Sequence, residues 1–106
     1  MKISFNTKEV EKLCTDIKVM QRKLPSNVTR KLQILMTTLE NMKHMTEFQL
    51  PVYARYRYHQ LSGDMQGITS LSIDYSYRMT LVVEIVGTQD NCDEICIWEV
   101  SNHYGD

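Results

Sequence analysis

Three side chains in the second half of the chain have the residue types that RNA cleavage requires: His59, Arg78 and His103. In that reaction a base removes the proton of a 2′-hydroxyl, the oxygen attacks the adjacent phosphate, and an acid protonates the leaving 5′-oxygen. Histidine can serve as base or acid because its unperturbed pKa is about 6.5. A guanidinium can hold two phosphate oxygens and stabilise the charge that builds on them. The trio would therefore suit RNA cleavage that needs no metal ion or cofactor.

Each of these residues also has a plainer interpretation. A histidine in a loop is most often solvated, and Arg78 is close enough in sequence to Asp74 to form an ion pair with it. Tyrosines near the trio could offer faces on which RNA bases stack, although tyrosines in strands are often half-buried. The tyrosines concerned are Tyr58, Tyr75, Tyr77 and Tyr104. Spacing alone leaves both interpretations open.

The hydrophobic pattern predicts the elements that must position these side chains. Alternating apolar residues indicate strands at 2–5, 67–73, 78–86 and 93–101. Helical spacing indicates one helix from about 8 to 23, with Thr7 as its N-cap, and a second over about 18 residues from Val28. Pro25 separates the two helices, and Pro51 ends the helical region. The order β-α-α-β-β-β predicts an α+β fold, with a helical hairpin packed on one face of a small antiparallel sheet.

This topology predicts where the trio lies. Successive antiparallel strands place Arg78, at the start of one strand, and His103, just after the last strand, at the same end of the sheet. The residues from 60 to 67 can span about 26 Å, and a seven-residue strand is about 23 Å long. The loop after His59 is therefore long enough to bring that residue to the same end, although nothing in the sequence obliges it to do so.

Size and cysteine content narrow the class of protein. A chain of 106 residues makes one domain, and its composition is that of a soluble globular protein, with 42% hydrophobic and 24% charged residues. No apolar stretch approaches the ~20 residues of a membrane span, and no signal peptide is evident. An odd number of cysteines favours reduced thiols and a cytoplasmic protein. Cys92, Cys96 and His103 match no common zinc spacing, so no metal site is expected.

The charges divide unevenly along the chain. Residues 1–57 hold eleven basic and five acidic side chains, whereas residues 58–106 hold one basic and eight acidic ones, and the net charge is −1. Such asymmetry indicates either a polyanionic partner or a basic face that meets an acidic one. Lysines that are simply solvated on long helices explain the pattern equally well.

Two stretches of the second half resemble the RelE/HigB superfamily of bacterial toxins, and more narrowly its HigB, or plasmid maintenance killer protein, branch. They read Tyr-His-Gln-Leu-Ser-Gly-Asp-Met-Gln-Gly at 58–67 and Ser-Leu-Ser-Ile-Asp-Tyr-Ser-Tyr-Arg-Met at 70–79. The closing Glu-Val-Ser-Asn-His-Tyr at 99–104 is similar to the family's last strand and following histidine. The resemblance spans the chain, but only residues 57–104 carry specific motifs.

The resemblance implies the toxin of a type II toxin–antitoxin system, a ribosome-dependent mRNA endoribonuclease (mRNA interferase) that inhibits translation. His59, Arg78 and His103 fall on the family's catalytic positions. Its partners would be mRNA on the ribosome, ribosomal RNA and a HigA-like helix-turn-helix antitoxin, in a possible toxin–antitoxin heterotetramer. Ser62 and Ser72 stand where the family has basic residues.

The missing cations lead to a hypothesis about RNA binding. We expect Arg55 and Arg57 to replace them, with Tyr58, Tyr77 and Tyr104 as further RNA contacts. A net charge of −1 gives little surplus for non-specific RNA binding, so we expect the ribosome to hold the substrate.

Two other functions remain open. The same fold would suit a ParE-like inhibitor of DNA gyrase, and fold alone does not decide between the two activities. Two histidines flanking an arginine favour the nuclease, because a gyrase poison needs no acid–base pair. A degenerate, non-catalytic antitoxin-binding module is the third possibility, suggested by the serines at 62 and 72.

Overall fold

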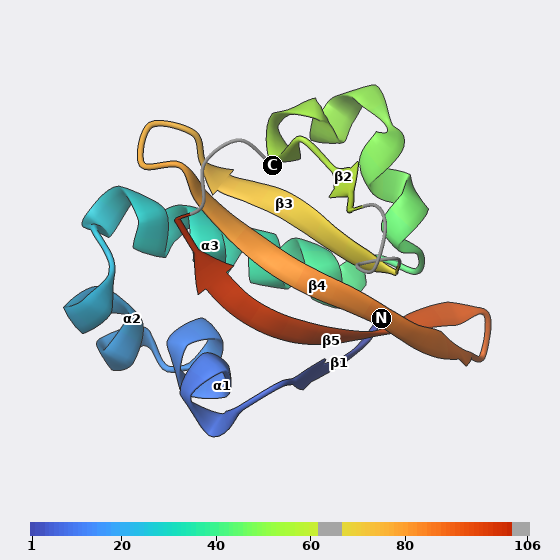
Figure 1. The fold of residues 1–106 in the computed structure, drawn as a ribbon, viewed down its shortest axis with the longest axis horizontal. Coiled ribbons are helices and arrows are strands. Elements are labelled where there is room, and N and C mark those ends of the chain that lie inside the picture. The colour runs from blue at the N-terminus through green and yellow to red at the C-terminus, as the bar shows by residue number, and fades with distance from the viewer. Residues whose placement is uncertain (62–66, 103–106) are drawn as a thin grey trace.

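The computed structural model describes residues 1–61 and 67–102, so His103 and Tyr104 lie outside the described residues. The chain forms a five-stranded sheet in the order β1-β5-β4-β3-β2, with helices packed against it (Figure 1). The strands are β1 (Lys2–Phe5), β2 (His59–Gln60), β3 (Ile68–Asp74), β4 (Met79–Gln89) and β5 (Cys92–Ser101). The helices are α1 (Lys8–Thr15), α2 (Ile17–Lys23), α3 (Ser26–Asn41) and the short 3₁₀ helices η1 (Met45–Gln49) and η2 (Pro51–Tyr56).

Antiparallel pairing builds most of the sheet. β2 pairs with β3, β3 with β4, and β4 with β5. The β4–β5 hairpin turns at Asp90 and Asn91, whose φ angles of 55° and 61° suit a tight two-residue turn with both residues left-handed. β1 runs parallel to β5, so the expected purely antiparallel sheet is wrong at this edge. Parallel neighbours need a long crossover connection, and the rest of the chain supplies it.

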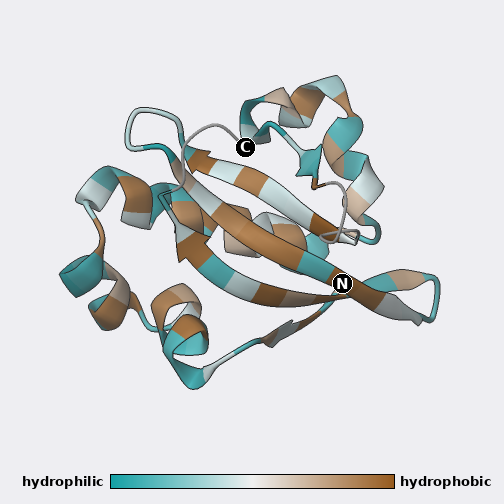
Figure 2. Cartoon of the chain, viewed as in Figure 1, coloured by the Kyte–Doolittle hydropathy of each residue, from teal (hydrophilic) through white to brown (hydrophobic). Residues whose placement is uncertain are grey.

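The hydrophobic core lies between α3 and one face of the sheet. The apolar stripe of α3 includes Leu32, Leu35 and Leu39, which are fully buried, and α3 lies behind the sheet in Figure 1. Leu71 of β3 and Leu81 of β4 are buried against it. In β3 the apolar Leu71 and Ile73 alternate with polar residues, because successive side chains point to opposite faces, whereas β4 has a continuous apolar stretch in its middle (Figure 2). The predicted α+β arrangement is confirmed.

The expected single helix from 8 to 23 is two helices. Asp16 leaves the helical conformation, with φ −102° and ψ 108°, and its side chain accepts hydrogen bonds from the backbone N–H groups of Lys18 and Val19. Its own N–H still donates to the carbonyl of Lys12. Asp16 therefore ends α1 and caps α2, which is the local bonding that aspartate offers in place of a continuous helix.

Pro51 does not end the helical region: α3 stops at Asn41, and Pro51 begins η2. Proline suits this first position because the missing N–H has no helical partner there. None of the helices in the described part of the chain combines the length and apolar character needed to span a membrane.

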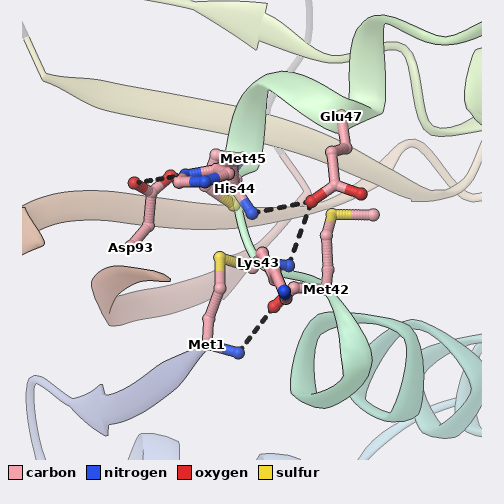
Figure 3. Close-up of polar contacts among 7 residues, drawn as sticks. All are labelled: Met1, Met42, Lys43, His44, Met45, Glu47 and Asp93. Carbon is pink, nitrogen blue, oxygen red and sulfur yellow. Dashed lines mark hydrogen bonds and ion pairs between the residues drawn. The ribbon is translucent and has the colours of Figure 1, made fainter. Parts of the chain in front are cut away.

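Polar contacts fix the segment between α3 and η1 to the start of the edge strand β1 and to its neighbour β5 (Figure 3). The Met1 ammonium donates to the carbonyl of Met42 at 2.6 Å. The Asp93 carboxylate of β5 accepts from the backbone N–H of Met45 at 2.7 Å, and Glu47 accepts from the two N–H groups just before η1. This network anchors the start of the 3₁₀ segment, which carries Arg55 and Arg57 to the opposite edge of the sheet.

Candidate functional site

The turn between β3 and β4 sets the position of Arg78. The Asp74 carboxylate accepts from the backbone N–H of Tyr77 at 3.1 Å and from Lys31 Nζ of α3 at 2.9 Å. The backbone N–H of Arg78 donates to the carbonyl of Tyr75 at 3.1 Å. The side chain of Asp74 is buried, and its hydrogen bond with Lys31 lowers the pKa of the carboxyl despite the opposing effect of burial. An ionised Asp74 thus holds the turn against α3.

Arg78 itself has a left-handed backbone, with φ 53°. This conformation costs an L-residue other than glycine about 1–2 kcal/mol, and such strain gathers at functional sites. Glycine would occupy the position without that cost. The backbone conformation alone would favour glycine at this position. The presence of arginine therefore indicates that its guanidinium has a role.

His59 lies beside the middle of β3, with Ser70 as its partner in the β2–β3 pair. Leu71 belongs to the core, so alternation puts Ser70 and His59 on the face of the sheet opposite α3. The imidazole is exposed. The end of β3 where Arg78 follows is four residues further, or about 13 Å along the strand. His59 therefore does not lie at the β3–β4 turn. It lies on the same sheet, beside the middle of β3.

A cavity of about 210 Å³ lies beside the turn, between α3, η2 and the end of β3. Its lining residues are Lys31, Ile34, Arg55, Tyr56, Ser72, Ile73 and Tyr75; we refer to it as the Arg55 cavity. The guanidinium of Arg55 lies 4.8 Å from the centre of the Tyr56 ring and donates to its hydroxyl at 2.8 Å. The guanidinium of Arg57 lies 4.7 Å from the centre of the exposed Tyr75 ring. Two arginines of the η2 segment therefore lie next to Ser72 and the Arg78 turn.

The tyrosines expected to contact RNA are not equivalent. Tyr77 is exposed and lies in the turn. Tyr58 is half-buried, and its ring stacks nearly parallel on Phe48 with centroids 6.3 Å apart. One face of the Tyr58 ring thus packs on the edge of the core, and its contact with RNA stays a prediction.

Sequence reasoning missed Lys31 and Ile34 as members of a site. Both lie on α3 beside the buried stripe, and nothing in their spacing distinguishes them from other surface positions of that helix. The plain interpretation of Arg78 as the ion-pair partner of Asp74 also missed Lys31, because the pair bridges 43 positions of the sequence. Charged residues commonly lie next to the apolar stripe of a helix. The position of Lys31 in the sequence therefore does not reveal its contact with Asp74.

The cysteines do not gather with other ligands in the described residues. Cys14 is buried, which raises the pKa of its thiol to about 12, whereas Cys92 and Cys96 are half-buried on β5. Residues 1–61 and 67–102 contain no group of three potential metal ligands.

Solved structures share this fold over nearly the whole chain. A YoeB/ParE toxin from Agrobacterium tumefaciens has a TM-score of 0.62 and 19% identity, covering 98% of this chain and 100% of that one. A histidine-to-glutamine variant of YafQ from E. coli has a TM-score of 0.60 and 21% identity, covering 94% and 90%. The YoeB–YefM complex from Staphylococcus aureus gives 0.58 and 19%, covering 98% of both chains. No protein-family model and no curated protein matches the sequence.

These likenesses establish the architecture. The protein has the RelE/YoeB-like α+β fold, as the sequence motifs implied. At about 20% identity a shared fold does not carry activity with it, and the function depends on the residues of the site.

Proposed function

We propose that this chain is the toxin of a type II toxin–antitoxin system and acts as a ribosome-dependent mRNA endoribonuclease. One observation carries the proposal: the turn that bears Arg78 in a left-handed backbone adjoins a cluster of cations and exposed tyrosines on a toxin fold. Arginines interleaved with aromatic rings are what single-stranded RNA binds, through its phosphates and its bases.

The proposed reaction uses two imidazoles and the guanidinium. One histidine, of His59 and His103, accepts the proton of the 2′-hydroxyl, and the 2′-oxygen forms a bond to the phosphorus. The bond to the 5′-oxygen breaks as the other histidine protonates it, leaving a 2′,3′-cyclic phosphate. Arg78 stabilises the charge on the phosphate oxygens during this exchange. RNA lying across the sheet face opposite α3 would pass both His59 and the Arg78 turn.

Arg55 and Arg57 are proposed to replace the basic residues that the family has at positions 62 and 72. The lining of the Arg55 cavity supports this role at position 72, because Ser72 and Arg55 border the same space. A long cation from η2 can therefore reach the region that an arginine on β3 would occupy. Ser62 lies outside the described residues.

Mapping of transcript ends after induced expression tests the activity. The wild-type chain is expected to arrest growth and to produce new ends within translated mRNA. His103→Ala and His59→Ala should each lower cleavage by about 10²-fold or more, because each removes a general acid or base. Folded variants that keep antitoxin binding but lose toxicity support the proposal.

The alternatives give different outcomes in the same cells. Trapped gyrase–DNA cleavage complexes with intact mRNA would replace the proposal with a ParE-like activity, which the description of the A. tumefaciens neighbour also names. An inert chain that still binds its antitoxin would indicate a degenerate module. Growth arrest unchanged in the Arg55→Ala/Arg57→Ala variant would contradict the role given to these arginines.

The proposed partners follow from the same comparison. The YoeB–YefM toxin–antitoxin complex from S. aureus is heterotetrameric, and we propose an antitoxin partner for this chain also. The sequence motifs favour the HigB branch and hence a helix-turn-helix antitoxin of the HigA type. A small helix-turn-helix gene beside this one would support that assignment. The proposed site of action is the ribosome in the cytoplasm.

A further inference from the structure

The Arg55 cavity has a composition that the cleavage chemistry does not require. Four of its seven lining residues are apolar or aromatic, namely Ile34 of α3, Ile73 of β3, Tyr56 and Tyr75. Cleavage needs only contacts to the phosphate and the two reacting oxygens. The apolar and aromatic lining of the Arg55 cavity, next to the Arg78 turn, therefore suits recognition of a part of the RNA other than the scissile phosphate.

The side chains that line the cavity carry a net positive charge. Lys31 is offset by Asp74, whose carboxylate lies 2.9 Å from it. Arg55 lines the space, and Arg57 lies next to it over the ring of Tyr75. The described residues that line the cavity include no carboxylate. The lining of the cavity thus combines net positive charge with apolar and aromatic side chains, which suits a flat ring attached to an anion.

The size of the cavity restricts the ligand further. Its volume of about 210 Å³ is below the ~300–1,000 Å³ of pockets that enclose drug-sized molecules. A single base fits this description, whereas a longer segment of RNA does not. The Arg55 side chain can contact the attached phosphate, because guanidinium groups bind phosphate oxygens in pairs.

We propose that the Arg55 cavity is a nucleotide subsite, which receives one unstacked base of the RNA where the strand passes from the sheet face opposite α3 around the β3–β4 turn, with Arg55 on the phosphate of that nucleotide. The turn connects the subsite to Arg78, since the carbonyl of Tyr75 accepts from the backbone N–H of Arg78. The subsite would thereby set a base preference of the enzyme. The identity of the ligand as RNA rests on the proposed function; the cavity itself can be tested without it.

Titration of the purified full chain with 5′-AMP, adenosine and inorganic phosphate, followed by NMR, tests the subsite. AMP should shift the signals of Ile34, Ile73 and Tyr75, and should bind about tenfold more tightly than adenosine or phosphate alone, because only AMP has both base and anion. Ile34→Trp should weaken AMP binding about tenfold by filling the cavity. Ile34 is partly exposed, at 44%, so the larger ring need not disturb the core.

Two matched controls separate the cavity from general effects. Ile17→Trp makes the same change at a residue of similar exposure, 38%, on α2 and outside the Arg55 cavity. Arg55→Gln removes a cation that lines the cavity. Its control, Arg30→Gln, removes an exposed cation of α3 that does not line the cavity. Both controls should leave AMP binding within about twofold.

The outcomes distinguish this inference from the proposed function. If the wild-type chain cleaves mRNA but AMP shifts no cavity residue, the subsite is wrong and the function stands. If AMP binds as expected in a chain that cleaves no mRNA, the subsite stands and the function is wrong. Equal binding of phosphate and AMP, insensitive to Ile34→Trp, would reduce the cavity to an anion site and overturn the base-binding role.

Discussion

At the scale of single residues, Arg78 has a backbone conformation that does not favour its residue type, which indicates that its side chain serves function and not folding. Its left-handed φ of 53° is unfavourable for any residue with a β-carbon. Two of the other positive φ angles belong to Asp90 and Asn91, residue types that tolerate this conformation. Arg78 and Arg57, with φ 49°, have no such tolerance. Both arginines adjoin the proposed RNA path, which supports a role for their side chains.

Replacing Arg78 by glycine and by alanine tests this separation. Both variants lose every contact of the guanidinium, so their difference isolates the backbone. Arg78→Gly should unfold with about 1 kcal/mol more free energy than Arg78→Ala, because glycine accepts a positive φ. Both should lose about 10²–10³-fold in cleavage, as expected when a charge-stabilising group is removed.

Urea unfolding and a cleavage assay on ribosome-bound mRNA provide the two measurements. Tyr77 has no positive φ, and Tyr77→Gly against Tyr77→Ala is the control, for which glycine should be the less stable variant. If the two Arg78 variants were equally stable, the left-handed backbone of Arg78 would carry no strain, and it would no longer indicate a role for the side chain.

At the scale of elements, the ion pair of Lys31 and Asp74 joins α3 to the β3–β4 turn. The carboxylate also accepts from the backbone N–H of Tyr77, so one buried side chain fixes both the shape of the turn and its distance from the helix. The Arg55 cavity opens between these same elements. Loss of the pair should therefore loosen the proposed site as well as the fold.

The effect of this pair on stability should depend on pH. The lowered pKa of Asp74 means that the folded state holds its proton less tightly than the unfolded chain, in which the pKa is about 3.9. The stabilisation is complete above that value and is lost as the pH falls through the folded-state pKa. Asp74→Asn should cost about 1–3 kcal/mol at pH 7, and the difference from wild type should shrink below about pH 4.

Urea unfolding of both proteins across this pH range measures the effect. Asp90→Asn, which makes the same change in the exposed β4–β5 turn, is the matched control and should differ little from wild type at any pH. A cost for Asp74→Asn that stays constant down to pH 2 would show that the charge of Asp74 does not stabilise the turn.

Much of the element layout could be predicted from the sequence, because alternation and helical spacing depend on near neighbours. The stripe of α3 and the three long strands came from this signal. The break at Asp16 could not be predicted, since apolar spacing continues through it from Leu13 to Ile17. At Asp16 two hydrogen-bonding patterns compete locally: a continuous helix, and a cap in which the Asp16 side chain accepts from backbone N–H groups. The structure has the cap.

The candidate site was less predictable, because it depends on register. Sequence spacing left the position of His59 free along the length of a strand, and the hydrogen bonds of a two-residue strand opposite Ser70 fixed it. The contacts of Lys31 with Asp74, and of Arg57 with Tyr75, join segments whose separation in the sequence carries no local signal. Arg78, by contrast, directly follows a turn and could be placed from the strand order alone.

At the scale of the whole molecule, the fold extends over 90% of the YafQ chain and 100% of the A. tumefaciens toxin. The charge, by contrast, is divided unevenly along the chain. The surplus of positive charge in residues 1–57 includes Arg55 and Arg57 beside the proposed site. The net charge of −1 leaves little general attraction for RNA. Binding to ribosomes should therefore depend on a small number of positioned cations.

Salt dependence of ribosome binding measures that number. Each cation that neutralises a phosphate contributes about −0.7 to −0.9 to the slope of log affinity against log salt. The Arg55→Gln/Arg57→Gln variant should reduce the magnitude of the slope by about 1.5 in co-sedimentation with ribosomes over a range of KCl concentrations. Arg55→Lys/Arg57→Lys keeps both charges and should retain most of it. A slope that the glutamine variant leaves unchanged would place the docking cations elsewhere.

The pairing of β1 with β5 has a consequence for how the protein is made. β1 emerges from the ribosome well before β5, yet it needs β5 as its neighbour, as the register from Lys2 with Glu94 to Phe5 with Ile97 requires. Contacts this distant in sequence are slow to form, because a long loop must close first. A nascent chain therefore cannot complete its sheet while β5 is still inside the exit tunnel. Under the proposed activity, cleavage should therefore begin only after β5 has left the tunnel and paired with β1.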